Sequence, residues 1–237
     1  MKYMKKKIIY GKIYAKGTNK TFKELEFGVS ELAQQYVDYY IEMTESIELF
    51  KGFYVGRYEL TGKKGNATVT SGKVLTGINT DGTNLNWHDF YNECQSFYVD
   101  NIHVISTMIW GCQWDAIMIW IDSTADKTGK YIDAKNKSII WGNYGNSELK
   151  NESMDLGIGI NTGANEITKA NNIYDLAGNY SEWTQEAYNN SRILRGGSYE
   201  ETNENNCYAA YRGESCISNS FENFSSRPVL YLKNRVY

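Results

Sequence analysis

The stretch NIYDLAGNYSEWT, residues 172–184, carries the clearest structural signal in this chain. Asp175, Gly178, Asn179 and Glu182 fall within one tight turn, where glycine lets the backbone fold back and expose its carbonyl groups. Hard oxygen ligands gathered in this way suit calcium. The other interpretation is that Asp175 and Asn179 accept hydrogen bonds from turn amides and that Glu182 pairs with an arginine.

Two further segments, one before and one after this motif in the sequence, are also distinctive. GFYVGRYE, residues 52–59, has the aromatic pattern of a strand, and RGGSY, residues 195–199, is followed later by Arg212 and Arg227. Together the three segments resemble the formylglycine-generating-enzyme (sulfatase-modifying factor) domain family, over roughly residues 50–233. GCQWD, residues 111–115, further resembles a helix start common in bacterial and prophage members.

The resemblance implies an α+β fold, a variant of the C-type-lectin-like fold, with short twisted strands, two or three packed helices and long loops. The hydrophobic share of 41% and the aromatic share of 14% are enough to fill a sizeable core. We expect a basic segment and helix at residues 1–48 and the formylglycine-generating-enzyme-like domain at residues 49–237. The resemblance also implies a structural calcium ion on Asp175 and Glu182, with the backbone carbonyls of Gly178 and Tyr180.

Apolar periodicity predicts three helices. One stripe runs from Val29 to Ile47. A second helix begins after the cap Asn86, with Cys94 on its buried face, and a third carries Trp114, Ile117, Met118 and Ile121. Strands are predicted over residues 53–60, 193–194, 208–211 and 229–232, a surface excursion over residues 62–81, and a loop-rich middle over residues 122–172.

The residues argue against an enzyme. The oxidase branch of the family holds a copper ion with two nearby cysteines just after the RGGSY motif, and soft thiolates select that metal. Here Cys207 lies near the second of those positions, whereas Glu201 or Thr202 occupies the first and Cys216 follows nine residues later. One thiol cannot form that site, so activity would require Cys216 to fold back against Cys207. His88 and His103 are interpreted as structural residues.

The favoured function is recognition of a ligand or receptor through the irregular C-terminal region. Its short polar and aromatic side chains resemble those of a binding surface, because rigid aromatic rings lie beside small hydrogen-bonding groups. Enrichment in Asn and Ser is also typical of any surface loop. The candidate ligand-binding residues are Asn203, Asn205, Asn206, Tyr208, Tyr211, Glu214, Asn219, Phe221 and Asn223.

The resemblance, together with the composition, indicates the class of partner. Some relatives are diversified in this region for receptor binding, including tail-associated proteins of phages, so we expect a glycan or protein ligand on a surface. A structural subunit of a phage or surface assembly, contacting its neighbour through residues 1–50, is the alternative. Arg195, Arg212 and Arg227 could bind an acidic ligand, although interior arginines are more often tied to carboxylates.

A net charge of −3 offers no broad positive field that would attract nucleic acid.

The N-terminal sequence is the part of the chain that bears on localisation. The run Ile8–Tyr10 is too short for a signal-peptide core or a membrane span. We expect a protein that is cytoplasmic before assembly, associated with a virion, exported without an N-terminal signal, or cut from a longer chain.

Overall fold

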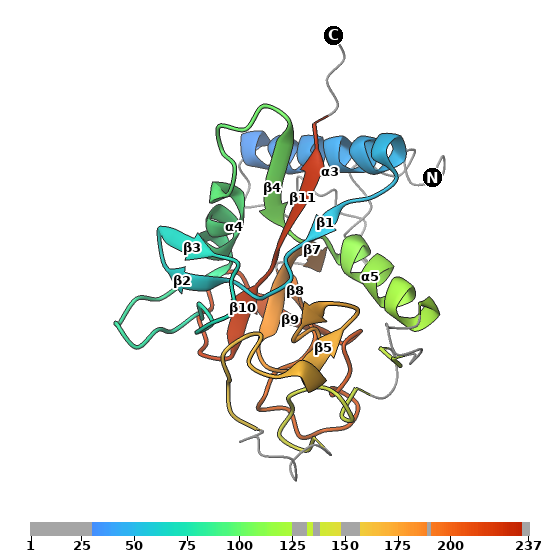
Figure 1. The fold of residues 1–237 in the computed structure, drawn as a ribbon. Helices are drawn as coiled ribbons and strands as arrows, with labels where there is room; N and C mark the ends of the chain where they lie inside the picture. The colour runs from blue at the N-terminus through green and yellow to red at the C-terminus, as the bar shows by residue number, and fades with distance from the viewer. Residues whose placement is uncertain (1–29, 125–131, 135–137, 148–156, 189–190, 234–237) are drawn as a thin grey trace.

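The computed structural model describes residues 30–124, 132–134, 138–147, 157–188 and 191–233. Of the predicted basic segment and helix at residues 1–48, the part before residue 30 lies outside these residues. Within them the chain forms the helices α3 (Ser30–Phe50), α4 (Trp87–Ser96) and α5 (Gly111–Ser123) and several small sheets (Figure 1). The predicted α+β class is confirmed.

The helices follow the predicted periodicity. The side chain of Asn86 accepts hydrogen bonds from the amides of His88 and Asp89, and the Asp89 carboxylate accepts one from the Asn86 amide. This reciprocal capping box satisfies amides that have no partner within the first turn of α4. Cys94 is fully buried on this helix, as predicted, and all four predicted apolar positions of α5 are buried.

Two sheets organise the molecule. A three-stranded antiparallel sheet has the order β1 (Tyr54–Val55), β11 (Pro228–Leu232), β4 (Val104–Met108). A four-stranded sheet has the order β10 (Phe224–Ser226), β7 (Ser181–Tyr188), β8 (Ser191–Arg195), β9 (Arg212–Cys216), and only its β10–β7 pair is parallel.

Two small hairpins complete the described secondary structure. The strands β2 (Thr61–Lys63) and β3 (Asn66–Thr68) form one. The 3-10 turn η2 (Glu166–Thr168) leads into the other, β5 (Lys169–Ala170) and β6 (Ile173–Tyr174). The hairpin β2–β3 falls in the segment predicted as a surface excursion.

Two predicted strands are wrong in extent. The predicted strand over residues 53–60 is limited to β1; beyond it the Gly56 amide still donates to the Pro228 carbonyl at 2.9 Å, whereas Pro228 has no amide hydrogen to donate in return. The run from Tyr208 to Tyr211 is a turn, closed by a hydrogen bond of 2.9 Å from the Tyr211 amide to the Tyr208 carbonyl, and strand β9 begins at Arg212. The sequence reasoning also missed β7, which begins inside the motif and continues to Tyr188.

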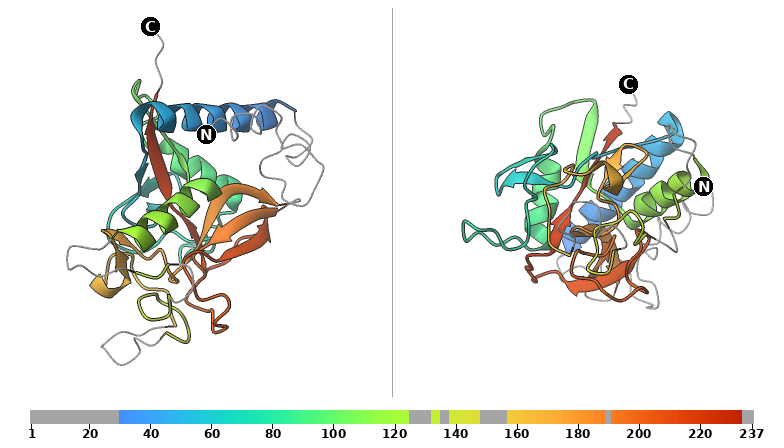
Figure 2. Two further views of the ribbon diagram at one scale, coloured as in Figure 1. Left: turned by 90° about the vertical axis from the view of Figure 1, so that its right-hand side faces the viewer. Right: turned by 60° about the horizontal axis from the view of Figure 1, so that its bottom comes forward.

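The buried core has two parts. One lies around Trp87, Trp110 and Trp183 and includes Tyr40 and Met43 of α3. The other lies beneath α5 around Trp114 and Trp141. Helix α3 lies across one end of the molecule, and the loops of the C-terminal third lie at the opposite end (Figures 1 and 2).

Among the described residues, no helix is both long and apolar enough to span a membrane.

Candidate ligand-binding surface

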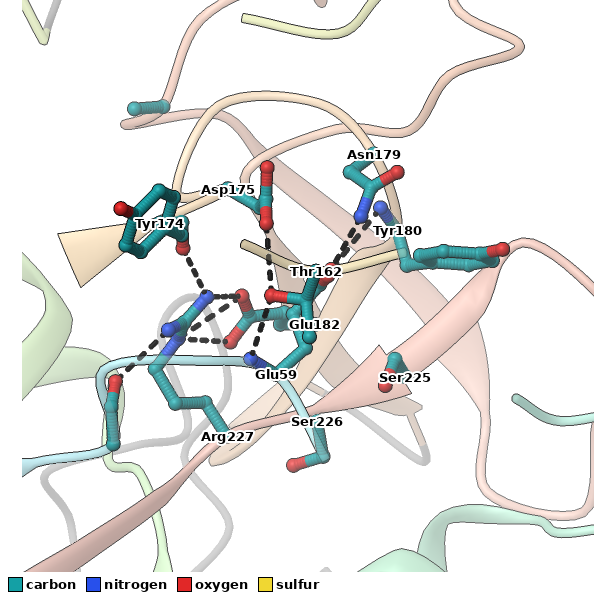
Figure 3. A network of polar contacts seen from close by, with 12 residues as sticks. Glu59, Thr162, Tyr174, Asp175, Asn179, Tyr180, Glu182, Ser225, Ser226 and Arg227 are labelled. Carbon is teal, nitrogen blue, oxygen red and sulfur yellow. Dashed lines mark hydrogen bonds and ion pairs between the residues drawn. The ribbon is translucent and has the colours of Figure 1, made fainter. Parts of the chain in front are cut away.

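A buried ion pair fixes the end of the motif. The guanidinium of Arg227 donates to both carboxylate oxygens of Glu182, with its shortest contact at 2.6 Å, and both side chains are completely buried (Figure 3). The same guanidinium donates to the backbone carbonyls of Gly56, at 2.9 Å, and Tyr174, at 2.8 Å. Arg227, between β10 and β11, therefore links β6, β7 and the residue that follows β1.

Two further buried carboxyl groups surround this pair. Glu59 accepts hydrogen bonds from the Asn179 side chain at 2.7 Å and the Tyr180 amide at 3.2 Å. Asp175 accepts from Thr168 at 2.6 Å and from Thr162 at 2.8 Å. Burial raises the pKa of Glu59 well above its ordinary value, and repulsion from Asp175 and Glu182 adds to the effect.

This arrangement does not suit the predicted calcium site. Glu182 faces the guanidinium of Arg227, and the Asp175 oxygens already accept hydrogen bonds from Thr168, Thr162 and the Gly163 amide. A cation beside Glu182 would lie against a fixed positive charge. The described residues contain no group of three His, Cys, Asp or Glu side chains that could hold a metal ion. The geometry matches the other interpretation, in which Glu182 pairs with an arginine.

The network also orients the chain that leads to the candidate surface. Asn179 has a positive φ of 60°, and its carbonyl accepts a hydrogen bond of 2.9 Å from the Tyr199 amide at the start of the β8–β9 loop. The rings of Tyr180 and Tyr199 meet edge to face at 5.5 Å. Burial and the nearby carboxylates Glu200 and Glu222 raise the pKa of Tyr199 to about 12.

Buried side chains hold the β8–β9 loop, residues 196–211, from beneath. The Tyr144 hydroxyl donates to the Gly196 carbonyl at 2.7 Å, and the Trp114 indole donates to the Ala209 carbonyl at 2.9 Å. The Ser138 hydroxyl accepts from the Ala209 amide at 3.0 Å. A loop held by bonds to buried groups presents its outward side chains in a fixed arrangement, which lowers the entropic cost of binding.

All nine predicted ligand-binding residues lie at the surface. Asn203, Asn205, Glu214 and Phe221 are exposed, and Asn206, Tyr208, Tyr211, Asn219 and Asn223 are partly buried. They come from the β8–β9 loop, from β9 and from the β9–β10 turn, residues 217–223. We call these residues, with Tyr180 and Tyr199, the C-terminal surface.

The side chains of the C-terminal surface form two groups. In the first, the rings of Tyr208 and Tyr211 meet edge to face at 5.9 Å, and Asn206 donates to Glu201 at 3.1 Å. In the second, Asn223 donates to Glu200 at 2.7 Å, and the rings of Phe221 and Phe224 lie 5.0 Å apart.

Sequence reasoning missed Tyr180 and Tyr199 as members of this surface. Both belong to the motifs from which the resemblance was drawn; the resemblance assigned the Tyr180 carbonyl to the calcium site and gave Tyr199 no separate role. Both are partly buried and lie beside the β9–β10 turn, because Glu222 contributes to the raised pKa of each. The sequence signal that could have identified them is an aromatic residue placed directly after a tight, glycine-containing turn.

The predicted arginines serve the framework. Arg195 donates to Asp115 at 2.6 Å, and Arg212 donates to the other Asp115 oxygen at 3.1 Å and pairs with Glu186. With the Arg227–Glu182 pair, all three arginines are tied to carboxylates, although only Arg195 and Arg227 are buried.

Cys207 and Cys216 are free and have different surroundings. The buried Cys207 thiol contacts Asn146 and the carbonyls of Glu201 and Asn203, whereas the exposed Cys216 thiol contacts Ser218. Burial raises the pKa of Cys207 to about 11, so its thiol stays protonated at neutral pH.

No family model matches the chain, and no curated protein matches its sequence. Solved structures of similar fold include Treponema denticola variable protein 1, with 14% identity, a TM-score of 0.48, and coverage of 75% of this chain and 84% of that one. PvdO from Pseudomonas aeruginosa has 14% identity, a TM-score of 0.45, and coverage of 76% and 80%.

The M1 variant of the Major Tropism Determinant has 15% identity and a TM-score of 0.46, with 78% of this chain aligned to 51% of that one. These structures are C-type-lectin-like folds, the class predicted from the sequence. At this level the likeness concerns the fold and says nothing of what this chain binds.

Proposed function

We propose that the chain is a non-catalytic binding module that recognises a cell-surface protein or glycan through the C-terminal surface. One observation carries the proposal. Five of the nine predicted residues lie on the β8–β9 loop, whose backbone is bonded to the buried residues Tyr144, Trp114 and Ser138. Aromatic rings and short amides on a rigid support resemble the composition of evolved binding surfaces.

The C-terminal surface suits a macromolecular partner. The described residues include concavities of about 650, 470 and 560 Å³, and none of these is lined by a predicted residue of this surface. Small ligands are usually enclosed in concavities of this size, whereas protein and polymer partners are met by exposed side chains. On the sequence resemblance alone, we also propose that the chain is a member of the formylglycine-generating-enzyme-like family and that it acts on a phage tail or a cell surface.

The test is binding of the full chain to a glycan array and to whole bacterial cells. Saturable binding is expected in the wild type and is expected to be lost in Tyr208→Ala/Tyr211→Ala. The melting temperature should stay unchanged, because both rings are only partly buried. The matched control is Tyr98→Ala, an exposed tyrosine outside this surface, which should bind as the wild type does. Loss of binding in the control, or binding retained in the double variant, would place recognition elsewhere.

The oxidase alternative predicts a copper(I) site on Cys207 and Cys216. The raised pKa of Cys207 and the different contacts of the two thiols weigh against it. Titration of the free thiols with and without copper(I) tests this: protection of both thiols together would support an oxidase.

A further inference from the structure

A second concavity of about 560 Å³ lies away from the C-terminal surface. Its lining residues come from the α3–β1 connection, from α5 and from the β5–β6 hairpin. Figure 1 shows where these elements lie in the fold. Its volume falls within the range of small-molecule sites in proteins, which are mostly apolar with a few placed polar groups. Its residues are Lys51, Gly52, Phe53, Tyr54, Val55, Arg57, Ala116, Ile117, Trp120, Asn171, Asn172 and Ile173. We call it the Trp120 pocket.

Exposed aromatic rings form its rim. Trp120 is 43% exposed and Tyr54 is 66% exposed. The other five tryptophans, at positions 87, 110, 114, 141 and 183, are all at most 4% exposed. Trp120 also lies off the buried stripe of α5, so packing within the described core does not account for it. Indole and phenol rings at the rim of a pocket offer flat apolar faces that can cover one face of a ligand ring.

The polar groups of the pocket are amides and cations. Asn171 and Asn172 have positive φ angles of 44° and 75° and form a tight two-residue turn between β5 and β6. Asn171 is held by the Thr124 carbonyl at 3.2 Å, whereas the Asn172 side chain has no partner among the described residues. The exposed side-chain amide of Asn172 can therefore both donate to and accept from a hydroxyl group.

The charge of the pocket favours an anion. Lys51 and Arg57 line it, and none of its lining residues is an aspartate or glutamate. Arg57 lies over the rings of Tyr58 and Tyr174 at 5.5 and 5.3 Å, and Lys51 donates to the Glu48 carbonyl at 2.7 Å. These contacts hold both cations in place at the pocket.

We propose that the Trp120 pocket binds an acidic sugar, a pyranose ring bearing a carboxylate or phosphate group. Trp120 and Tyr54 cover the apolar face of the ring, Asn172 bonds its hydroxyls, and Lys51 and Arg57 attract the anionic group. This site is separate from the C-terminal surface, so the chain has two binding sites at different places.

The test uses the one exposed tryptophan of the full chain as its own probe. Acrylamide quenching of tryptophan fluorescence reports mainly on Trp120, because the other indoles are buried. A panel of uronic acids, sialic acid and sugar phosphates is titrated beside the neutral parent sugars. Acidic members should protect Trp120 saturably, and neutral members should protect it only at about tenfold higher concentration.

Two variants test the polar contacts without straining the backbone. The variants are Asn172→Gly and Lys51→Gly. Asn172 has a φ of 75° and Lys51 a φ of 62°, and glycine adopts such positive φ angles without strain. Asn172→Gly should weaken protection by every sugar, and Lys51→Gly should reduce the preference for acidic sugars. Tyr208→Ala/Tyr211→Ala should leave protection unchanged, which separates this proposal from the proposed function.

Two results would overturn the assignment. One is that no acidic sugar of the panel protects Trp120. The other is that protection persists unchanged in an Asn172→Gly/Lys51→Gly double variant.

Discussion

At the scale of single residues, the Arg227–Glu182 pair is the strongest polar constraint. Both side chains are completely buried, so removing one leaves the other as an uncompensated group. We expect Arg227→Met and Glu182→Leu each to lower the free energy of unfolding by about 3–5 kcal/mol. Urea denaturation of each variant measures this.

The double variant provides the control. Glu182→Leu/Arg227→Met should be less destabilised than the sum of the single variants, because no isolated charge remains. It should still be less stable than the wild type, since the carbonyls of Gly56 and Tyr174 lose their donor. Additive losses would mean that the two groups do not interact as the geometry indicates.

Glu59 makes stability depend on pH. Its pKa is raised in the folded chain, so the folded state binds more protons than the unfolded state once pH exceeds the ordinary value of 4.5. The contribution of Glu59 to the free energy of unfolding is therefore fully present below pH 4.5, and it is lost as pH rises toward the raised pKa of Glu59. We expect Glu59→Gln to flatten the decline in unfolding free energy above pH 4.5.

Urea denaturation at several pH values compares Glu59→Gln with the wild type. Glu222→Gln, at an exposed position, is the control and should retain the wild-type slope. An unchanged slope in Glu59→Gln would show that Glu59 titrates alike in both states. Asp175 and Glu182 also have raised pKa values, so some slope should remain.

The sequence indicated part of this network. A pairing of Glu182 with an arginine was one of two interpretations of the motif. The sequence did not show that the arginine is Arg227 or that Glu59 joins the network. Arg227 lies 45 positions from Glu182, and Glu59 lies 120 positions from Asn179. Contacts over such distances depend on how the strands pair, which local pattern does not encode.

At the scale of elements, Gly77 sets the position of the β9–β10 turn. A Cβ atom at Gly77 would lie 2.4 Å from the Phe221 carbonyl oxygen and 2.7 Å from its amide nitrogen. Backbone atoms cannot yield cheaply, so we expect Gly77→Ala to displace the turn and cost about 1–3 kcal/mol.

Hydrogen exchange measures this displacement. The Phe224 amide, bonded to the Phe221 carbonyl at 3.2 Å, should exchange faster in Gly77→Ala. Gly52→Ala is the matched control, because a Cβ atom there meets nothing within 4 Å. Equal exchange in both variants would mean that the turn does not depend on the loop that carries Gly77.

Helices were better predicted than strands, for a physical reason. A helix satisfies its hydrogen bonds within one segment, so the apolar period of α4 and α5 was sufficient. The extent of a strand depends on a partner elsewhere in the chain, and the two residues of β1 pair with Leu230 and Val229, far along the sequence. The sequence also held an unused signal in Ile119 and Trp120, two large apolar residues off the buried stripe of α5.

At the scale of the whole molecule, α3 shares the core of the chain. The Tyr40 ring meets Trp110 edge to face at 4.8 Å, and Met43 is 1% exposed. The Tyr231 hydroxyl of β11 donates to the Tyr39 carbonyl at 3.4 Å. The helix that the sequence assigned to a separate N-terminal segment thus packs against the three-stranded sheet.

This packing predicts that α3 is required for stability. Met43→Ala should lower the free energy of unfolding by about 2–5 kcal/mol, because it leaves a cavity in the part of the core that includes Trp110. Removing residues 1–50 should cost more, since Trp110 and Tyr231, at most 1% exposed, would then lie open to water. Leu49→Ala is the control: its side chain is 56% exposed, so stability should change little. If the shortened chain melted at the wild-type temperature, α3 would be a separate attachment segment, and its Tyr-rich face would be free for a neighbouring subunit.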